Sequence, residues 1–161
     1  MKQKNHMKEE QQDLKLDLEN HFTALVLWLS NKMTAGASKV YREKFGMGVN
    51  EWRVLSYVEL FPWSTGKQMC DLMGVDKSAV SRGCAELMER GLIISRPLGL
   101  RKIEYSITPK GKKMFQRFLR VSLARQEALL TGFSDAERKL LNSFMHRLLE
   151  NLPLAENASE E

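Results

Sequence analysis

The spacing of apolar and polar positions predicts a mainly helical chain. From about Leu14 to Phe45, apolar residues recur at helical intervals, and this pattern stops before Gly46. A second apolar face follows, for which Asn50 is the expected N-cap and Pro62 the expected stop. Helices with such apolar stripes must bury them against a partner.

Two short helices are predicted next, each with its own start and stop. Thr65 and Gln68 form a T-x-x-Q capping box, and the helix that they open is expected to end at Gly74. Asp76 is expected to cap the following helix, which runs to Gly91. Two helices joined by a tight turn in this way predict a helix-turn-helix.

After Gly91 the pattern changes from helical to extended. A branched apolar run, LIISR, is followed by residues 103–107, in which apolar and polar positions alternate. Between the two runs lies PLGLRK, where Pro97 and Gly99 are turn-forming residues. We therefore predict a β-hairpin.

Two C-terminal helices complete the order. Thr108 followed by Pro109 predicts a capped start for a helix that runs towards Gly132, and Ser134 with Glu137 forms a second capping box. The predicted fold class is mainly α with a small β-hairpin wing (α+β): a winged helix-turn-helix with N- and C-terminal dimerisation helices.

The expected domains follow this order. We predict a flexible N-terminal segment at 1–13, dimerisation helices at 14–48 and 109–152, a winged helix-turn-helix DNA-binding domain at 49–108, and a flexible acidic tail at 153–161.

Charge is concentrated around the hairpin. The chain has 161 residues and a formal net charge of +5. The stretch from Arg96 to Arg120 holds eight basic residues and one acid, a net +7, so the rest of the chain carries −2. This distribution favours a polyanionic partner for the hairpin region.

The helix after Asp76 is the candidate recognition helix. Projected at 100° per residue, its inner face comprises Val80, Gly83, Cys84 and Leu87, and its outer face Ser78, Ser81, Arg82 and Ala85. A small, hydrogen-bonding face with one long cation is compatible with a major groove roughly 12 Å wide. The alternative is an ordinary solvated face.

The sequence resembles the multiple-antibiotic-resistance regulator (MarR) family. The resemblance rests on VNEWRVLSYV, on the helix-turn-helix segment, on ERGLI, and on IEYSITPKG, where Ile107, Thr108 and Gly111 match a closing strand followed by L-T-x-x-G. It implies a dimer whose terminal helices interlock, with recognition helices in successive major grooves and wings at the flanking minor grooves. It also implies a ligand cleft between the dimerisation helices and the DNA-binding lobe.

Carried over by position, the resemblance makes Arg101 the wing arginine. Family wings usually place an aspartate two residues earlier, where this chain has Gly99, and the hairpin loop is shorter. Either Arg101 contacts only phosphate, or Arg96, Arg101 and Lys102 together provide a sequence-independent grip. These charges could also serve only solubility.

Two sets of candidate residues result. The DNA-binding candidates are Thr65, Lys67, Lys77, Ser78, Ser81, Arg82, Arg96, Arg101 and Lys102. The effector-binding candidates, which the alternative assigns to the core, are Trp28, Met33, Tyr41, Trp52 and Met114.

Other chemistry has little support. Cys70 and Cys84 occupy packing positions and are interpreted as core thiols rather than peroxide sensors, and the three histidines are isolated. We expect no metal, no cofactor, no enzymatic site, no membrane span and no signal peptide, hence a cytoplasmic, nucleoid-associated protein.

The predicted function is sequence-specific regulation of transcription. We expect a homodimer that binds a pseudo-palindromic site on double-stranded DNA, represses a promoter, and is released by a small-molecule effector. The alternatives are a low-specificity nucleoid-type DNA binder and a helical protein-interaction module that has lost DNA binding.

Overall fold

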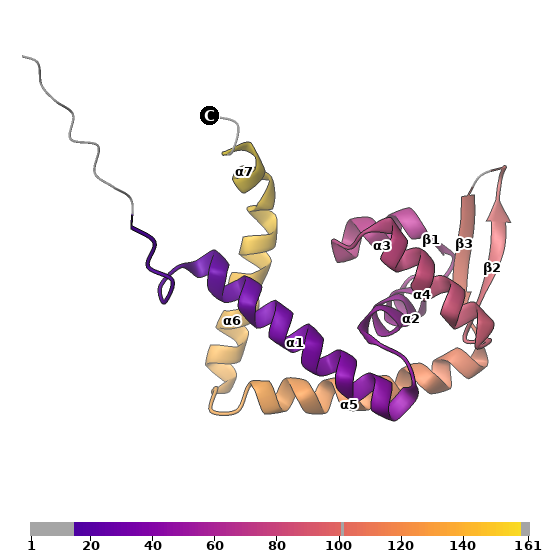
Figure 1. The fold of residues 1–161 in the computed structure, drawn as a ribbon, viewed down its shortest axis with the longest axis horizontal. Helices are drawn as coiled ribbons and strands as arrows, with labels where there is room; N and C mark the ends of the chain where they lie inside the picture. The colour runs from indigo at the N-terminus through magenta and orange to yellow at the C-terminus, as the bar shows by residue number, and fades with distance from the viewer. Residues whose placement is uncertain (1–14, 101, 159–161) are drawn as a thin grey trace, which may run out of the picture. The chain divides into compact units, whose positions relative to one another are not determined.

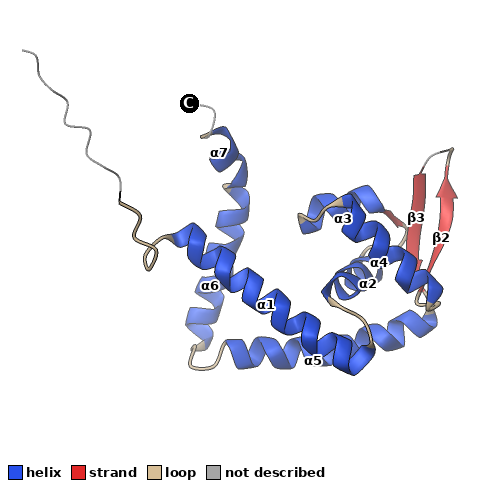
Figure 2. Cartoon of the chain, in the orientation of Figure 1, coloured by secondary structure: helices blue, strands red, loops and turns tan. Residues whose placement is uncertain are grey.

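The computed structural model describes residues 15–100 and 102–158. These residues form two compact units, one up to Arg53 and one from Val54 onward, and each is described by itself. The elements, drawn in Figures 1 and 2, are α1 (Phe22–Phe45), α2 (Val49–Leu60), β1 (Ser64–Thr65), α3 (Gly66–Met73), α4 (Lys77–Glu89), β2 (Ile93–Leu98), β3 (Lys102–Ile107), α5 (Pro109–Leu129), α6 (Asp135–Glu150) and α7 (Leu152–Asn157).

Helix α1 begins later than the sequence predicts. The expected start was about Leu14, but the helix starts at Phe22, capped by the ring Nδ1 of His21. The preceding residues form a turn in which the Asp17 carboxylate accepts a hydrogen bond of 2.8 Å from the Asn20 side chain. Asp and Asn side chains that bond locally compete with helical hydrogen bonding, so the apolar spacing alone misplaced the boundary.

The junction between α1 and α2 also differs from the prediction. Asn50 was expected to cap the second helix, but it lies inside α2, which starts at Val49. The carboxylate of Glu51 instead accepts a 2.6 Å hydrogen bond from the backbone N–H of Gly48. A side chain one turn into the helix thus satisfies a backbone donor at its start.

The helix-turn-helix forms as predicted. Thr65 and Gln68 complete the capping box of α3, and Gly74 ends that helix with φ +61°. Asp76 caps α4 by accepting from the Ala79 N–H at 2.8 Å. After α4, Gly91 turns the chain with φ +68°.

The wing is a three-stranded antiparallel sheet in the order β1-β3-β2. The predicted hairpin is confirmed, with Leu98 paired to Lys102 at its outer end and Ile93 to Ile107 at its base. Strand β1, which pairs Ser64 with Tyr105, is not predicted from the sequence. A strand of two residues has too little alternation to be recognised from sequence.

The helices after the wing start at the predicted caps. The Thr108 hydroxyl accepts from the Gly111 N–H at 2.9 Å and opens α5, and Ser134 with Glu137 forms the capping box of α6. The short helix α7 overlaps residues 153–157 of the predicted flexible acidic tail.

The core of the second unit gathers apolar side chains from α2, α3, α4, the hairpin and α5. Its most deeply buried members are Leu55, Val58, Met69, Cys84, Leu87, Leu92, Ile93 and Phe118. Helix α3 contacts α4 as well as β1 and β3, so this core fixes α4 relative to the wing.

Candidate nucleic-acid interface

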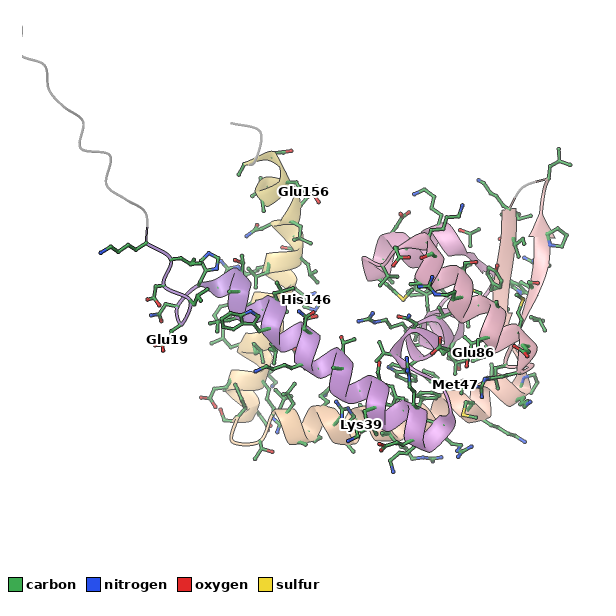
Figure 3. The ribbon with its side chains drawn as sticks, viewed as in Figure 1. Glu19, Lys39, Met47, Glu86, His146 and Glu156 are labelled. Atoms are coloured by element: carbon green, nitrogen blue, oxygen red, sulfur yellow. The ribbon has the colours of Figure 1, made fainter. Side chains whose placement is uncertain are left out.

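The two faces of α4 are segregated as the sequence predicts. Val80, Gly83, Cys84 and Leu87 are buried, whereas Ser78, Ser81, Arg82 and Ala85 are exposed. The acidic Glu86, labelled in Figure 3, belongs to the second half of the helix. It pairs with Arg90 at 2.9 Å. The first two turns therefore present a polar surface free of acidic side chains beyond the Asp76 cap.

Hydrogen bonds organise this surface. The Ser78 hydroxyl donates to the Asp76 carboxylate and accepts a 3.1 Å hydrogen bond from Nη1 of Arg82. The Ser78 hydroxyl, the Ala79 N–H and the nearby Arg82 charge lower the pKa of Asp76 below its usual value. The helix start and the Arg82 side chain are thus linked through Ser78, which limits the freedom of the arginine before any partner binds.

A groove of about 560 Å³ lies between the helix-turn-helix and the wing. One lysine enters it from each of three elements: Lys67 from α3, Lys77 from α4 and Lys102 from β3. Lys67 also pairs with the exposed Asp71 at 2.6 Å. The remaining lining residues are Thr65, Gly66, Cys70, Val80, Ser81, Cys84, Ile103 and Tyr105.

Both cysteines contribute to the wall of this groove. Cys84 is only 1% exposed, and burial raises the pKa of its thiol to about 12, with a smaller contribution from Cys70. A thiol with such a pKa carries almost no thiolate near neutral pH, so Cys84 is a poor nucleophile. This agrees with its interpretation as a core thiol, and Cys70 is half-buried.

Arg96 is held within the wing. Its guanidinium stacks over the Trp63 ring at 3.9 Å, and Nε and Nη2 both donate to the Glu104 carboxylate at 2.9 Å. Trp63 reaches this position with φ +60°, a conformation uncommon for a residue with a side chain. Arg96 thus has one partner before β1, Trp63, and one within the wing, Glu104, and its predicted contact with DNA stays a prediction.

The remaining DNA-binding candidates have different surroundings. Lys77 and Lys102 are exposed at the groove, while the Thr65 hydroxyl is engaged in the cap of α3. Arg101 lies outside the described residues. The structure thus gathers Lys67, Lys77, Ser81 and Lys102 around one groove.

The effector-binding candidates do not line this groove. In the first unit the rings of Tyr41 and Trp52 lie 6.2 Å apart, and Tyr41 is buried. Trp28 and Met33 are exposed on α1, and Met114, in the second unit, is half-buried on α5.

Several residues of the interface were not anticipated. Ile103 and Tyr105 were assigned only to the hairpin, although both line the groove, and Trp63 was given no role. The segment FPWST, an aromatic residue between Pro62 and a capping box, is the sequence pattern that points to Trp63. Its stacking partner is far away in sequence and could not be identified from that pattern.

The described part of the chain also bears on metal binding and membrane insertion. Within residues 15–100 and 102–158, no cluster of three or more His, Cys, Asp or Glu side chains is arranged to hold a metal ion. Among the helices of the same residues, none combines the length and apolar character that crossing a membrane requires.

Comparison with known proteins finds similarity to the MarR family. The model of the MarR family matches residues 45–99, which include α2, the helix-turn-helix and strand β2. A MarR/EmrR family transcriptional regulator from Acinetobacter sp. ADP1 has a similar structure, with a TM-score of 0.78 and 27% identity over 86% of this chain and 99% of that one. The chain is thus similar to the MarR family in the sequence of its helix-turn-helix region and in its fold.

Other MarR-family structures share the fold at lower identity. A regulator from Silicibacter pomeroyi has a TM-score of 0.75 and 19% identity, covering 84% of this chain and 92% of that one. The S. aureus MepR–DNA complex has a TM-score of 0.70 and 18% identity, covering 83% and 98%. No curated protein shows a significant sequence match. The fold is therefore that of MarR-family transcriptional regulators.

Proposed function

We propose that this protein is a MarR-family regulator that binds double-stranded DNA and regulates transcription, with α4 as its recognition helix. The observation that carries the proposal is the sharp division of α4 into a buried apolar face and an exposed face of Ser78, Ser81 and Arg82. Hydroxyl and guanidinium groups can donate to base edges and phosphates in a major groove.

The groove beside α4 supplies the contacts to phosphate. Lys67, Lys77 and Lys102 come from three separate elements and border one concave surface next to Ser81. When a helix lies in the major groove, a DNA strand passes along its side, and lysines there neutralise phosphates. The solved MepR–DNA complex has the same fold as this chain.

The protein acts as a homodimer in this proposal. Large apolar side chains are exposed on helices near both ends of the described chain, and α6 buries none of its residues. Those on α1 and α6 include Phe22, Leu25, Leu29, Met33, Leu140, Leu141, Phe144 and Met145. Exposed apolar side chains in such number on each of these helices indicate contact with another protein surface, and a second copy offers a self-complementary one.

The proposal also includes a finer assignment. We assign residues 14–48 and 109–152 to dimerisation and 49–108 to DNA binding. The dimer would cover a pseudo-palindromic operator with half-sites roughly 34–36 Å apart, repress a promoter by occluding it, and respond to a small-molecule effector. Such a protein works in the cytoplasm on the nucleoid.

Selection and footprinting test this function. The protein is used to select duplexes from a randomised pool, and the enriched duplexes are footprinted with hydroxyl radicals. We expect one enriched motif with two protected half-sites about one helical turn apart. Protection without an enriched motif would instead support a low-specificity DNA binder, which the three lysines of the groove would also suit, and no binding at low salt would overturn both functions.

A further inference from the structure

A row of side chains crosses the three-stranded sheet at one level. In the register of the strands, Glu104 of β3 is paired with Thr65 of β1 on one side and with Arg96 of β2 on the other. Strand β3 is therefore the middle strand, between β1 and β2 (Figure 1). Trp63 lies just before β1, and the Arg96 guanidinium is 3.9 Å from the centre of its ring. The stack thus connects the two edges of the sheet.

The same contacts hold the middle strand. Nε and Nη2 of Arg96 both lie 2.9 Å from one carboxylate oxygen of Glu104, whose side chain is only 13% exposed. A guanidinium that donates from its edge and stacks through its face has little freedom to move. We call Trp63, Arg96 and Glu104 the wing latch.

The wing latch lies on the face of the sheet that is turned away from the groove. Successive side chains of a strand point to opposite faces. Ile103 and Tyr105 line the groove, so Glu104 between them belongs to the other face, and Arg96 shares that face because the two are paired in register. Among the described residues, those that line the groove include no member of the latch.

The geometry of the groove depends on where β3 lies. The groove opens between α3 and α4 on one side and β3 on the other, and these elements supply Lys67, Lys77 and Lys102. Strand β1 joins β3 to the start of α3 but pairs with it at only two positions. The latch adds a link through side chains, from Trp63 at the same junction to Glu104 of β3. Supporting contacts of this kind fix the side chains of a binding site in place.

We propose that Trp63 and Arg96 are positioning residues for DNA binding, which hold β3 so that Lys102 contacts the DNA backbone together with Lys67 and Lys77. This inference rests on the proposed DNA-binding function and adds to it two residues that act without contacting DNA. A groove that is already arranged loses less conformational freedom on binding, which raises its affinity. The φ of +60° at Trp63 fits this role, because strained backbone persists where the surrounding contacts enforce it.

The test measures affinity for a duplex that the wild-type protein selects. Trp63→Leu removes the ring, Trp63→Phe keeps one, and Arg96→Lys keeps the charge but loses the planar fork. We expect Trp63→Leu and Arg96→Lys each to lower the affinity about fivefold, and Trp63→Phe to stay within about twofold of wild type. Trp63→Leu and Arg96→Lys together should cost no more than either alone, because both break the same latch.

A second comparison separates positioning from a general loss of stability. Lys102→Ala should weaken binding by the wild-type protein and make its salt dependence shallower, but have little further effect in Trp63→Leu, where Lys102 has already lost its position. The control background is Ile107→Val, which shortens a buried side chain at the base of β3 and leaves the latch in place. There Lys102→Ala should keep its full effect. Circular dichroism checks that each variant is folded.

Three results would overturn the inference while leaving the proposed function intact. The first is wild-type affinity in Arg96→Lys, and the second is a full Lys102→Ala effect in Trp63→Leu. The third is additive losses for Trp63→Leu and Arg96→Lys, which would indicate that Arg96 contacts phosphate itself. If Trp63→Leu does not fold, the Lys102→Ala comparison is made in Arg96→Lys with the same expected result. If the wild-type protein selects no duplex, the proposed function fails and the inference fails with it.

Discussion

The guanidinium of Arg96 lies over the ring of Trp63 at 3.9 Å while donating to Glu104 from its edge. The two residues come from the connection before β1 and from β2, so the stack fastens the wing to the chain that enters the helix-turn-helix. Trp63 has φ +60° in this arrangement, a backbone conformation that is energetically unfavourable for residues with a Cβ.

A double-mutant cycle measures this stack. We expect Trp63→Ala and Arg96→Ala to show a coupling of about 0.5–1 kcal/mol in the free energy of urea unfolding, because a cation over a ring is stabilised electrostatically. The matched control is the exposed pair of Glu86 and Arg90 in α4, which should couple by less than about 0.5 kcal/mol. Equal couplings in the two cycles would remove any special role for the Trp63 stack.

Gly111 occupies a position with no room for a methyl group. A Cβ there would lie 2.0 Å from the carbonyl oxygen of Leu92 and 2.7 Å from Cγ1 of Ile107. We expect Gly111→Ala to lower the free energy of unfolding by more than about 3 kcal/mol, because backbone atoms must shift. The control is Gly66→Ala, whose Cβ would meet only Val80 at 3.7 Å, and circular dichroism in urea should find it within about 1 kcal/mol of wild type.

Burial of Cys84 makes stability fall at high pH. The pKa of its thiol is raised from an ordinary value of 9.0 to about 12, so the unfolded chain loses this proton first. The stabilisation is complete below pH 9 and is lost as pH rises towards 12. Between pH 9 and 10.5 we expect the free energy of unfolding in urea to fall by about 1.5 kcal/mol more for wild type than for Cys84→Ala. Cys70→Ser should show the same pH dependence as wild type. A Cys84→Ala protein with the wild-type pH slope would contradict this.

The exposed apolar face of α6 predicts a mutation that separates the subunits. Phe144 is 45% exposed in the single chain, and a carboxylate placed there could not be buried in an interface. We expect Phe144→Glu to sediment as a monomer at micromolar concentration and to lose tight DNA binding. Asn142→Glu adds the same charge to an exposed polar position of the same helix and should remain dimeric. If both variants were monomeric, or both dimeric, the result would contradict a place for this face of α6 in the interface.

Local chemistry explains why much of this fold could be predicted from sequence. The caps at Thr65, Asp76, Thr108 and Ser134 satisfy orphan backbone donors within three residues, so their patterns are complete in the sequence itself. The two faces of α4 follow in the same way from helical periodicity.

The features that sequence could not predict depend on distant partners or on competing local bonds. Strand β1 exists because β3 pairs with it, and the role of Arg96 depends on Trp63, which lies 33 positions earlier in the chain. The groove requires α3, α4 and β3 to converge, which periodicity along one element does not specify. At the start of α1, apolar spacing suggested a helix where the Asp17 turn forms instead.

The central claim is that the exposed face of α4 identifies DNA sequence, and competition binding of one variant pair tests it most directly. Affinities of wild type, Arg82→Ala and Lys102→Ala are measured for the selected duplex and for random duplex over a range of salt concentrations. We expect Arg82→Ala to lower the affinity for the selected duplex by about ten- to a hundredfold and the affinity for random DNA much less. Lys102→Ala should weaken binding to both duplexes equally. It should also make the slope of log affinity against log salt concentration shallower by about one, because one phosphate contact is lost. An equal loss on both duplexes for Arg82→Ala would show that this face contacts only phosphate and would contradict the account.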